Sequence, residues 1–145
     1  MKKLFFALAL ALCLCGCAKQ QFAHEETAQE EIIVEKKVID LTEMNANMVY
    51  AEVMNMMNSP YEYRAKTVRV SGLLVAREED GETKLACLIL DAQECCQQGI
   101  EFLCENMTYP DDYPALGETI TVEGVFSYYT DGASVNLLLQ DALLF

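Results

Sequence analysis

The sequence predicts a mainly β protein with one N-terminal helix, folded as a small five-stranded barrel. Three observations predict it. Apolar residues recur with a helical period between residues 40 and 59, and with a period of two from residue 67 onward. Segments rich in Gly, Pro and Asp separate the alternating runs. Hydrophobic residues make up 52% of the 145-residue chain, which is enough to build one core.

The first seventeen residues are organised like a lipoprotein signal peptide. Met1-Lys2-Lys3 is positively charged, and the apolar stretch after it is too short to span a bilayer permanently. It ends in Leu14-Cys15-Gly16-Cys17, which resembles the bacterial lipobox. The resemblance implies cleavage before Cys17 and attachment of lipid, with acyl chains such as palmitate, to its sulfur. The alternative interpretations are an ordinary secretory signal and a short membrane helix.

We expect three regions: a signal peptide at 1–16, the lipidated cysteine with an acidic tether at 17–39, and a folded domain at 40–145. The tether is polar and lacks periodicity, apart from the candidate short strand Ile32–Val34. The only histidine, His24, lies in it and is interpreted as solvated. These features predict a protein anchored by lipid at the extracytoplasmic face of the cell membrane.

The charge of the chain excludes two classes of interaction. Lys and Arg number 10 against 23 Asp and Glu, which gives a net charge of −13. Nucleic-acid binding depends on clustered Lys and Arg, so we expect no nucleic-acid partner. Docking on anionic lipid through a basic patch is excluded for the same reason. The expected route to the membrane is the lipid anchor.

A capping signal and a proline bound the helical segment. Asp40-Leu41-Thr42-Glu43 has the spacing of an N-cap residue with a reciprocal Glu, and Pro60 ends the helix at or before Ser59. Five of the seven methionines fall in or beside this segment. They could form a copper site, but we favour gap filling between the helix and a sheet. The predicted buried face contains Ala46, Val49, Val53, Met56 and Met57.

Five strands are predicted at residues 67–75, 84–91, 100–104, 118–128 and 134–139. Gly72 and Gly124 lie inside strands, where glycine marks a bend or a bulge. Five short strands with such bends fit a closed or nearly closed barrel of the OB type, which removes unpaired strand edges. A small open sandwich is the competing topology.

Four cysteines of the predicted domain lie within eighteen residues, which raises the question of a tetrathiolate zinc site. Antiparallel pairing of the second and third strands is expected to put Cys87 opposite Cys104. Cys95 and Cys96 would then lie in the connecting loop, more than ~10 Å away. We therefore expect two separate pairs. For Cys87 and Cys104, buried free thiols are favoured over a cross-strand disulfide.

The adjacent Cys95-Cys96 pair lies in a polar loop, where packing alone does not explain two cysteines. Together with Lys66–Gly72, Leu90–Ala92 and Gly117–Gly124, the pair resembles small lipoproteins of Firmicutes that have an OB-like domain. It also resembles the extracytoplasmic C-terminal domain of a permease family that carries a Cys-Cys pair after the second strand. The resemblance covers about residues 45–140. It implies an OB-like fold and a role around metal or solute export.

Two thiols on one loop, with Asp91, Glu94 and Glu101 expected nearby, could hold a soft or borderline divalent ion such as zinc. Acidic neighbours raise the pKa of thiols, which disfavours a reactive thiolate unless a metal displaces the proton. The hypothesis is a metal site formed by Cys95, Cys96 and Asp91. A structural turn and a vicinal disulfide that shapes the loop are the alternatives.

No catalytic signature is found in the sequence. It has no histidine placed to activate a nucleophile, no glycine-rich phosphate loop and no His-Glu-x-x-His motif. Asp111-Asp112 lacks the ligand alternation of an EF-hand and is interpreted as solvated charge. Four tyrosines could line a barrel face as a ligand platform: Tyr109, Tyr113, Tyr128 and Tyr129.

The expected function is that of a lipid-anchored extracytoplasmic binding module, without enzymatic activity. It would take a metal ion or a small solute at the Cys95/Cys96 loop, as an accessory to a transporter. The alternative is an interaction module that docks another envelope protein and whose cysteines are purely structural.

Overall fold

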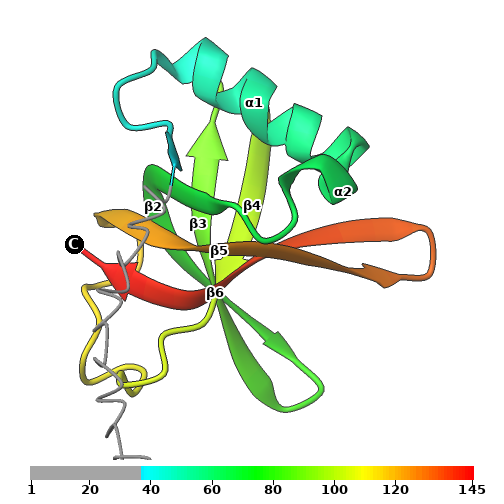
Figure 1. The fold of residues 1–145 in the computed structure, drawn as a ribbon. Helices are drawn as coiled ribbons and strands as arrows, with labels where there is room; N and C mark the ends of the chain where they lie inside the picture. Colours follow the sequence, from blue (N-terminus) through cyan, green and yellow to red (C-terminus); the bar gives the residue numbers. More distant parts are fainter. Residues whose placement is uncertain (1–36) are drawn as a thin grey trace, which may run out of the picture. The chain divides into compact units, whose positions relative to one another are not determined.

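A computed structural model describes residues 37–145 of the chain (Figure 1). The predicted signal peptide, the lipidation site Cys17, the candidate strand Ile32–Val34 and His24 lie outside the described residues. In chain order the elements are β1 (Val38–Asp40), α1 (Ala46–Asn58), α2 (Pro60–Tyr63), β2 (Thr67–Glu79), β3 (Glu82–Leu90), β4 (Gln97–Phe102), β5 (Thr119–Asp131) and β6 (Ser134–Leu144).

Strands β2 to β6 form a closed five-stranded barrel, which confirms the predicted fold class. The hydrogen-bonded order is β2-β3-β4-β6-β5, and β5 pairs back with β2. The β4–β6 pair is parallel, and the other four pairs of the barrel are antiparallel. This Greek-key order fits the OB type. Because β2 and β5 close the ring, the open sandwich considered from the sequence does not form.

Gly72 lies where β2 changes partners. Residues Thr67–Leu73 pair with β5 and residues Leu73–Glu79 pair with β3, so one strand belongs to both sides of the barrel. A Cβ atom at Gly72 would lie 2.8 Å from Cys87 Sγ and would also strike the Leu88 carbonyl oxygen. Only glycine fits this close crossing of backbones.

Gly124, also inside a strand, lies at the register shift between Glu123 and Val125, where this single residue of β5 is opposed by Asp141 and Ala142 of a bulge in β6. A Cβ atom here would lie 2.9 Å from the Gln140 carbonyl oxygen. Bulges increase strand bend and twist, which a small barrel needs in order to close. Gly124 therefore lies at a bulge, as predicted from the sequence, whereas Gly72 lies at a close crossing of backbones.

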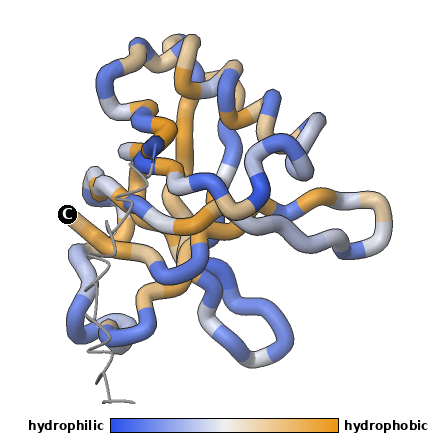
Figure 2. The backbone as a smooth tube through the Cα atoms, in the orientation of Figure 1, coloured by the Kyte–Doolittle hydropathy of each residue, from blue (hydrophilic) through white to orange (hydrophobic). Residues whose placement is uncertain are grey.

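Alternate residues of every barrel strand point into one core, as the period of two predicts. Apolar residues concentrate on the barrel strands, whereas the tip of the β2–β3 hairpin is hydrophilic (Figure 2). The buried apolar residues of the barrel strands are Val68, Val70 and Leu74 in β2, Leu85, Cys87 and Ile89 in β3, Ile100 and Phe102 in β4, Ile120, Val122 and Phe126 in β5, and Leu137, Leu139 and Ala142 in β6.

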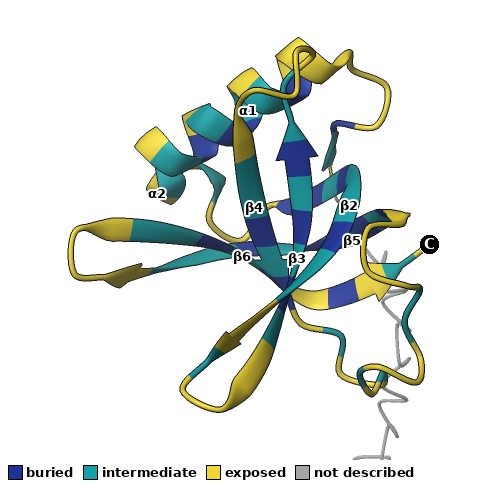
Figure 3. Ribbon diagram, turned by 180° about the vertical axis from the view of Figure 1, so that it is seen from behind, coloured by how far each residue is buried: buried dark blue, intermediate teal, exposed yellow. Residues whose placement is uncertain are grey.

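Helix α1 packs on the barrel beside β3, β4 and β6. One face of α1 is buried (Figure 3). Of the predicted buried residues, Val49, Val53 and Met56 are buried, whereas Met57 is half-buried and Ala46 is exposed. Met56 is completely buried, which agrees with the gap-filling interpretation, whereas 53% of Met48 is exposed. Among residues 37–145, no helix has both the length and the apolar character needed to cross a membrane.

The predicted capping box at Asp40 is wrong. Asp40 ends β1, and its carboxylate accepts hydrogen bonds from the Thr42 amide (2.9 Å) and the Thr42 hydroxyl (2.6 Å). The helix begins one turn later, with Asn45 as N-cap accepting from the Met48 amide at 3.1 Å. Asp and Asn both bind nearby amides, and here Asp40 forms a local turn before the helix. The predicted end at Pro60 is correct, and this proline also opens α2.

The predicted pairing of Cys87 with Cys104 is also wrong. Strand β4 begins at Gln97, earlier than expected, so that Cys87 lies opposite Ile100. The cause is the tightness of the β3–β4 connection, since Asp91 N donates to Cys96 O at 3.1 Å. Cys87 is buried, as predicted, and Cys104 is half-buried beyond the end of β4. All four cysteines of the described residues are free.

Candidate metal centre

The predicted site lies in the loop between β3 and β4, residues 91–96, at the end of the barrel that carries α1 (Figure 1). The loop is attached to the helix, because the Ala92 amide donates to Asn47 Oδ1 at 3.3 Å. Cys95 and Cys96 are both exposed and Asp91 is partly exposed. The prediction that the two cysteines lie in the polar loop that connects these strands is confirmed.

The loop folds around the carboxylate of Asp91. Its Oδ1 atom accepts hydrogen bonds from the amides of Cys95 (2.9 Å) and Cys96 (3.3 Å). The Glu94 amide donates to the Asp91 carbonyl at 3.1 Å, and Glu94 takes a left-handed backbone with φ of 56°. Aspartate is preferred in turns for this ability to bind amides two or more residues onward. Asp91 therefore brings two cysteines that follow it in sequence back over its own side chain.

The second carboxylate oxygen faces the thiols. Cys95 Sγ lies 3.2 Å from Asp91 Oδ2 and 3.6 Å from Cys96 Sγ. All three potential ligand atoms lie within 4.8 Å of one another. With Zn–S bonds of about 2.3 Å and Zn–O bonds of about 2.0–2.2 Å, a tetrahedral ion holds its ligand atoms about 3.5–3.8 Å apart. The group could accept such an ion if the distances from Cys95 Sγ to Asp91 Oδ2 and to Cys96 Sγ changed by a few tenths of an ångström. The ligand atoms of Asp91 and Cys96 would also have to come closer together.

The two oxygens of Asp91 thus have separate roles. Oδ1 is used to fold the loop, and Oδ2 is directed at the Cys95 thiol. An ion at this position would leave the amide hydrogen bonds to Oδ1 intact as outer-sphere support for its ligand. Three protein ligands would leave the fourth tetrahedral position open to water or to a ligand from another molecule.

The charges at the site favour a protonated thiol when no metal is present. The hydrogen bond to Asp91, followed by the contact with Cys96, raises the pKa of Cys95 to about 11. The same hydrogen bond from Cys95 lowers the pKa of Asp91. At neutral pH Cys95 is therefore a poor nucleophile, and an ion would have to displace its proton.

Helix α1 supplies two residues that the sequence did not associate with the site. Asn47 anchors the loop, and Tyr50 lies one turn further along the same helix, beside the Cys96 thiol. Burial is the main cause that raises the pKa of Tyr50, and electrostatic interactions with Cys96, Asp91 and Cys95 add to it. The spacing of three residues places Asn47 and Tyr50 on one helix face, but the sequence gives no indication of which loop that face meets.

Other residues considered from the sequence lie away from this loop or contribute no ligand. Glu101 was expected near the cysteines, but its carboxylate accepts hydrogen bonds from Tyr129 and Arg77 instead. Glu94 lies in the loop and is exposed. Asp112 closes a turn by accepting from the Thr108 amide at 2.7 Å.

A scan against models of protein families and a search of curated proteins each gave no match to the chain. The fold and the site therefore define its class: a barrel of the OB type with two exposed thiols and a carboxylate at one end, an arrangement that could bind a metal ion.

Proposed function

We propose that the protein is a lipid-anchored extracytoplasmic binding module that holds a divalent ion such as zinc at Asp91, Cys95 and Cys96. The observation that carries the proposal is the grouping of three ligand atoms within 4.8 Å. Two soft sulfur ligands and one oxygen suit zinc better than calcium or magnesium, which take oxygen ligands. The lipobox-like Leu14-Cys15-Gly16-Cys17 supports the anchor, and its resemblance to bacterial lipoproteins supports the extracytoplasmic location.

The exposure of the site supports transient binding rather than a structural role. Structural zinc sites are closed by four protein ligands, whereas this group has three and is open to solvent. An open position allows a ligand from another protein to take over the ion. Such exchange fits an accessory to a metal transporter, the role implied by the resemblance of residues 45–140.

Zinc content and affinity test the proposal. The full chain would be loaded with zinc, dialysed and assayed for bound metal, and its affinity would be measured by competition with a chromophoric chelator. We expect one ion per chain in the native protein and in Cys104→Ser, a control cysteine outside the loop. We expect none in the Cys95→Ser/Cys96→Ser variant, since loss of two ligands exceeds the 10–100-fold effect typical of outer-sphere partners.

The Asp91→Asn variant tests the metal ligand separately from the fold of the loop. Asp91→Asn keeps an oxygen that can accept the Cys95 and Cys96 amides, but it replaces the second, metal-facing oxygen by an NH₂ group. We expect this variant to keep its loop conformation, seen as unchanged amide chemical shifts, and to bind zinc at least ~10-fold more weakly. Equal zinc content in the native protein and the double cysteine variant would contradict the proposal.

One observation favours the alternative, an envelope interaction module whose cysteines are structural. Oδ1 of Asp91 already accepts two amides and Oδ2 accepts the Cys95 thiol, so the loop is held together by its own hydrogen bonds. Under this alternative the double cysteine variant would retain both its envelope partner in a pull-down and the metal content of the native chain.

A further inference from the structure

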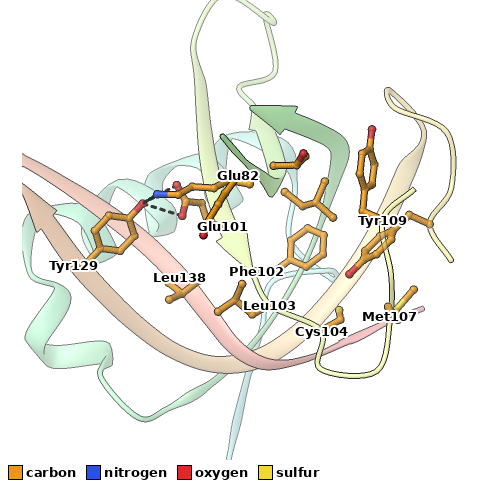
Figure 4. A pocket seen from close by; sticks show the side chains of 13 residues that line it. Glu82, Glu101, Phe102, Leu103, Cys104, Met107, Tyr109, Tyr129 and Leu138 are labelled. Atoms are coloured by element: carbon orange, nitrogen blue, oxygen red, sulfur yellow. Dashed lines mark hydrogen bonds between the residues drawn. The ribbon is translucent and has the colours of Figure 1, made fainter. Parts of the chain in front are cut away.

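A second candidate site lies at the opposite end of β3, roughly 20 Å along the strand from the cysteine loop. It is a cavity of about 400 Å³, bordered by the start of β3, the end of β4 and the segment that follows β4 (Figure 4). Its volume lies within the range of small-molecule sites. Three of the four tyrosines singled out in the sequence line it: Tyr109, Tyr113 and Tyr129.

The cavity exists because β4 leaves β3 early. The pair Ala86–Glu101 is the last between these strands, and Phe102 pairs with β6 instead. Residues Glu82–Leu85 of β3 therefore pair only with β2, so one edge of this stretch carries no ladder hydrogen bonds in the strand pairing. Unpaired backbone groups at a cavity wall can hydrogen-bond to a ligand.

One wall of the cavity is aromatic and uncharged. The Phe102 and Tyr113 rings lie 6.3 Å apart and the Tyr109 and Tyr113 rings 6.0 Å apart, so the three rings form a continuous surface. Burial, followed by a hydrogen bond with Cys104, raises the pKa of Tyr113 to about 12. Burial also raises the pKa of the Cys104 thiol. The phenol and the thiol are therefore both neutral at physiological pH.

The other end of the cavity is polar and held by a hydrogen-bond network (Figure 4). Tyr129 donates to the Glu101 carboxylate at 2.9 Å and accepts from Lys84 Nζ at 3.2 Å. Arg77 donates to the same carboxylate at 3.1 Å, and Lys84 forms an ion pair with Glu79. Only 17% of the Glu101 side chain is exposed, so its charge is fixed in place before any ligand arrives.

The charges at this end favour a cation over an anion. Lys84 and Arg77, the two basic residues of the network, already pair with carboxylates, and Glu82 adds a further acidic side chain to the lining. The net charge of the whole chain is −13, which repels anions and concentrates cations near the surface. Aromatic faces stabilise an organic cation as well.

We propose that this cavity binds a small amphipathic organic amine. Its aromatic or branched apolar body would lie against Phe102 and Tyr113, and its ammonium group would approach Glu101 and Glu82. This site is separate from the cysteine loop and does not depend on metal binding there.

The test compares three probes of similar shape and different charge: phenethylamine, 2-phenylethanol and 3-phenylpropionate. Binding to the full chain in phospholipid nanodiscs would be measured by titration calorimetry, with empty nanodiscs as the blank. We expect saturable binding of phenethylamine, about tenfold weaker binding of the alcohol, and none of the carboxylate. The tenfold difference corresponds to one charge-assisted contact.

Three variants locate the binding. Leu103 lines the cavity and is 58% exposed, so Leu103→Lys adds a positive charge without disturbing the core, and we expect it to abolish amine binding. Glu101→Gln should remove the preference for the amine over the alcohol. Glu123→Gln, a carboxylate that pairs with Arg69 outside this cavity, is the control and should change neither affinity.

Three results would overturn the proposal: no saturable heat with phenethylamine up to millimolar concentration, equal affinity for amine and alcohol in the native chain, or amine binding that survives Leu103→Lys. The Cys95→Ser/Cys96→Ser variant should bind phenethylamine as the native chain does. The cavity and the metal site can therefore fail independently.

Discussion

Substitution of Gly72 by alanine tests the closure of the barrel. At this position a Cβ atom would lie 2.8 Å from Cys87 Sγ and 3.0 Å from the Leu88 carbonyl carbon, and it would strike the Leu88 carbonyl oxygen. The sulfur belongs to a fully buried side chain and the other two atoms are backbone, so none of them can move cheaply. Overpacking of this kind costs about 1–3 kcal/mol or more. We expect Gly72→Ala to lie at the upper end of that range.

Gly99→Ala is the matched control, since Gly99 also lies inside a barrel strand, on β4. Its added Cβ atom would lie 3.7 Å from the nearest side-chain atom, the Cβ of Ala86, which is an ordinary van der Waals distance. We expect its free energy of unfolding to change by less than ~1 kcal/mol.

The assay is urea unfolding of both variants, followed by far-ultraviolet circular dichroism and by tyrosine fluorescence, because the chain has no tryptophan. The slope of the free energy against urea should stay constant, so that the midpoint reports stability. Equal destabilisation by the two alanines, or no effect at Gly72, would refute the explanation of barrel closure by a close backbone crossing.

Three further predictions concern the anchor, the thiol and the helix. Cys17→Ser should move the protein from the membrane fraction to the soluble fraction, measured by immunoblotting after cell fractionation; unchanged membrane retention would contradict the lipid anchor. Without metal, the alkylation rate of Cys95 should rise with pH up to about 11, because the thiolate forms only as the pH approaches the raised pKa. Asp91→Asn removes the largest cause of this pKa shift and should therefore move the pH profile to lower pH. Mass spectrometry of the alkylated peptides measures both rates. Asn45→Ala should lower the free energy of unfolding by ~1 kcal/mol through loss of the N-cap, whereas Glu43→Ala, at the capping position expected from sequence alone, should change it by less than ~0.5 kcal/mol.

The barrel is predicted well from the sequence because the position and inward face of each strand depend on short patterns of neighbouring residues. The alternation in β2 continues through Gly72, so the inward face can be read from Val68 to Leu74 without knowing the partner strands. Gly124, inside its strand, predicts the bulge for the same reason. Strand β1 was missed because it has only three residues and pairs in parallel with β2, a contact about thirty residues away in the chain.

The errors in register and capping have a shared physical cause. Strand pairing is fixed by the turn that joins the strands, and the turn at residues 91–96 depends on hydrogen bonds from two amides to one carboxylate. Two residues with nearly equal capping ability, Asp40 and Asn45, precede the helix, and tertiary pairing of β1 decides between them. In both cases local preference leaves several arrangements of similar energy, and contacts distant in sequence select one.

The part of the candidate metal centre that lies close together in the sequence could be predicted from it. Asp91, Cys95 and Cys96 lie within six residues, so a turn of ordinary chemistry brings them together. Asn47 and Tyr50 approach from a helix more than forty residues earlier, and only the packing of α1 on the barrel places them there. The position of Glu101 depends on the direction of its side chain on β4, which the erroneous register could not supply.

Both candidate sites lie toward ends of β3, where its pairing with β4 ends, while Leu85, Cys87 and Ile89 of the same strand are buried in the core. At one end a turn brings the side chains of Asp91, Cys95 and Cys96 together, and at the other end one edge of Glu82–Leu85 has no ladder partner. Closure of the barrel, by contrast, depends on the crossing at Gly72 in the interior of the fold. The residue on which closure depends is therefore not one of the proposed ligand contacts of either site. A variant that loses zinc or amine binding without loss of stability would fit this separation, and each site could vary in sequence without opening the barrel.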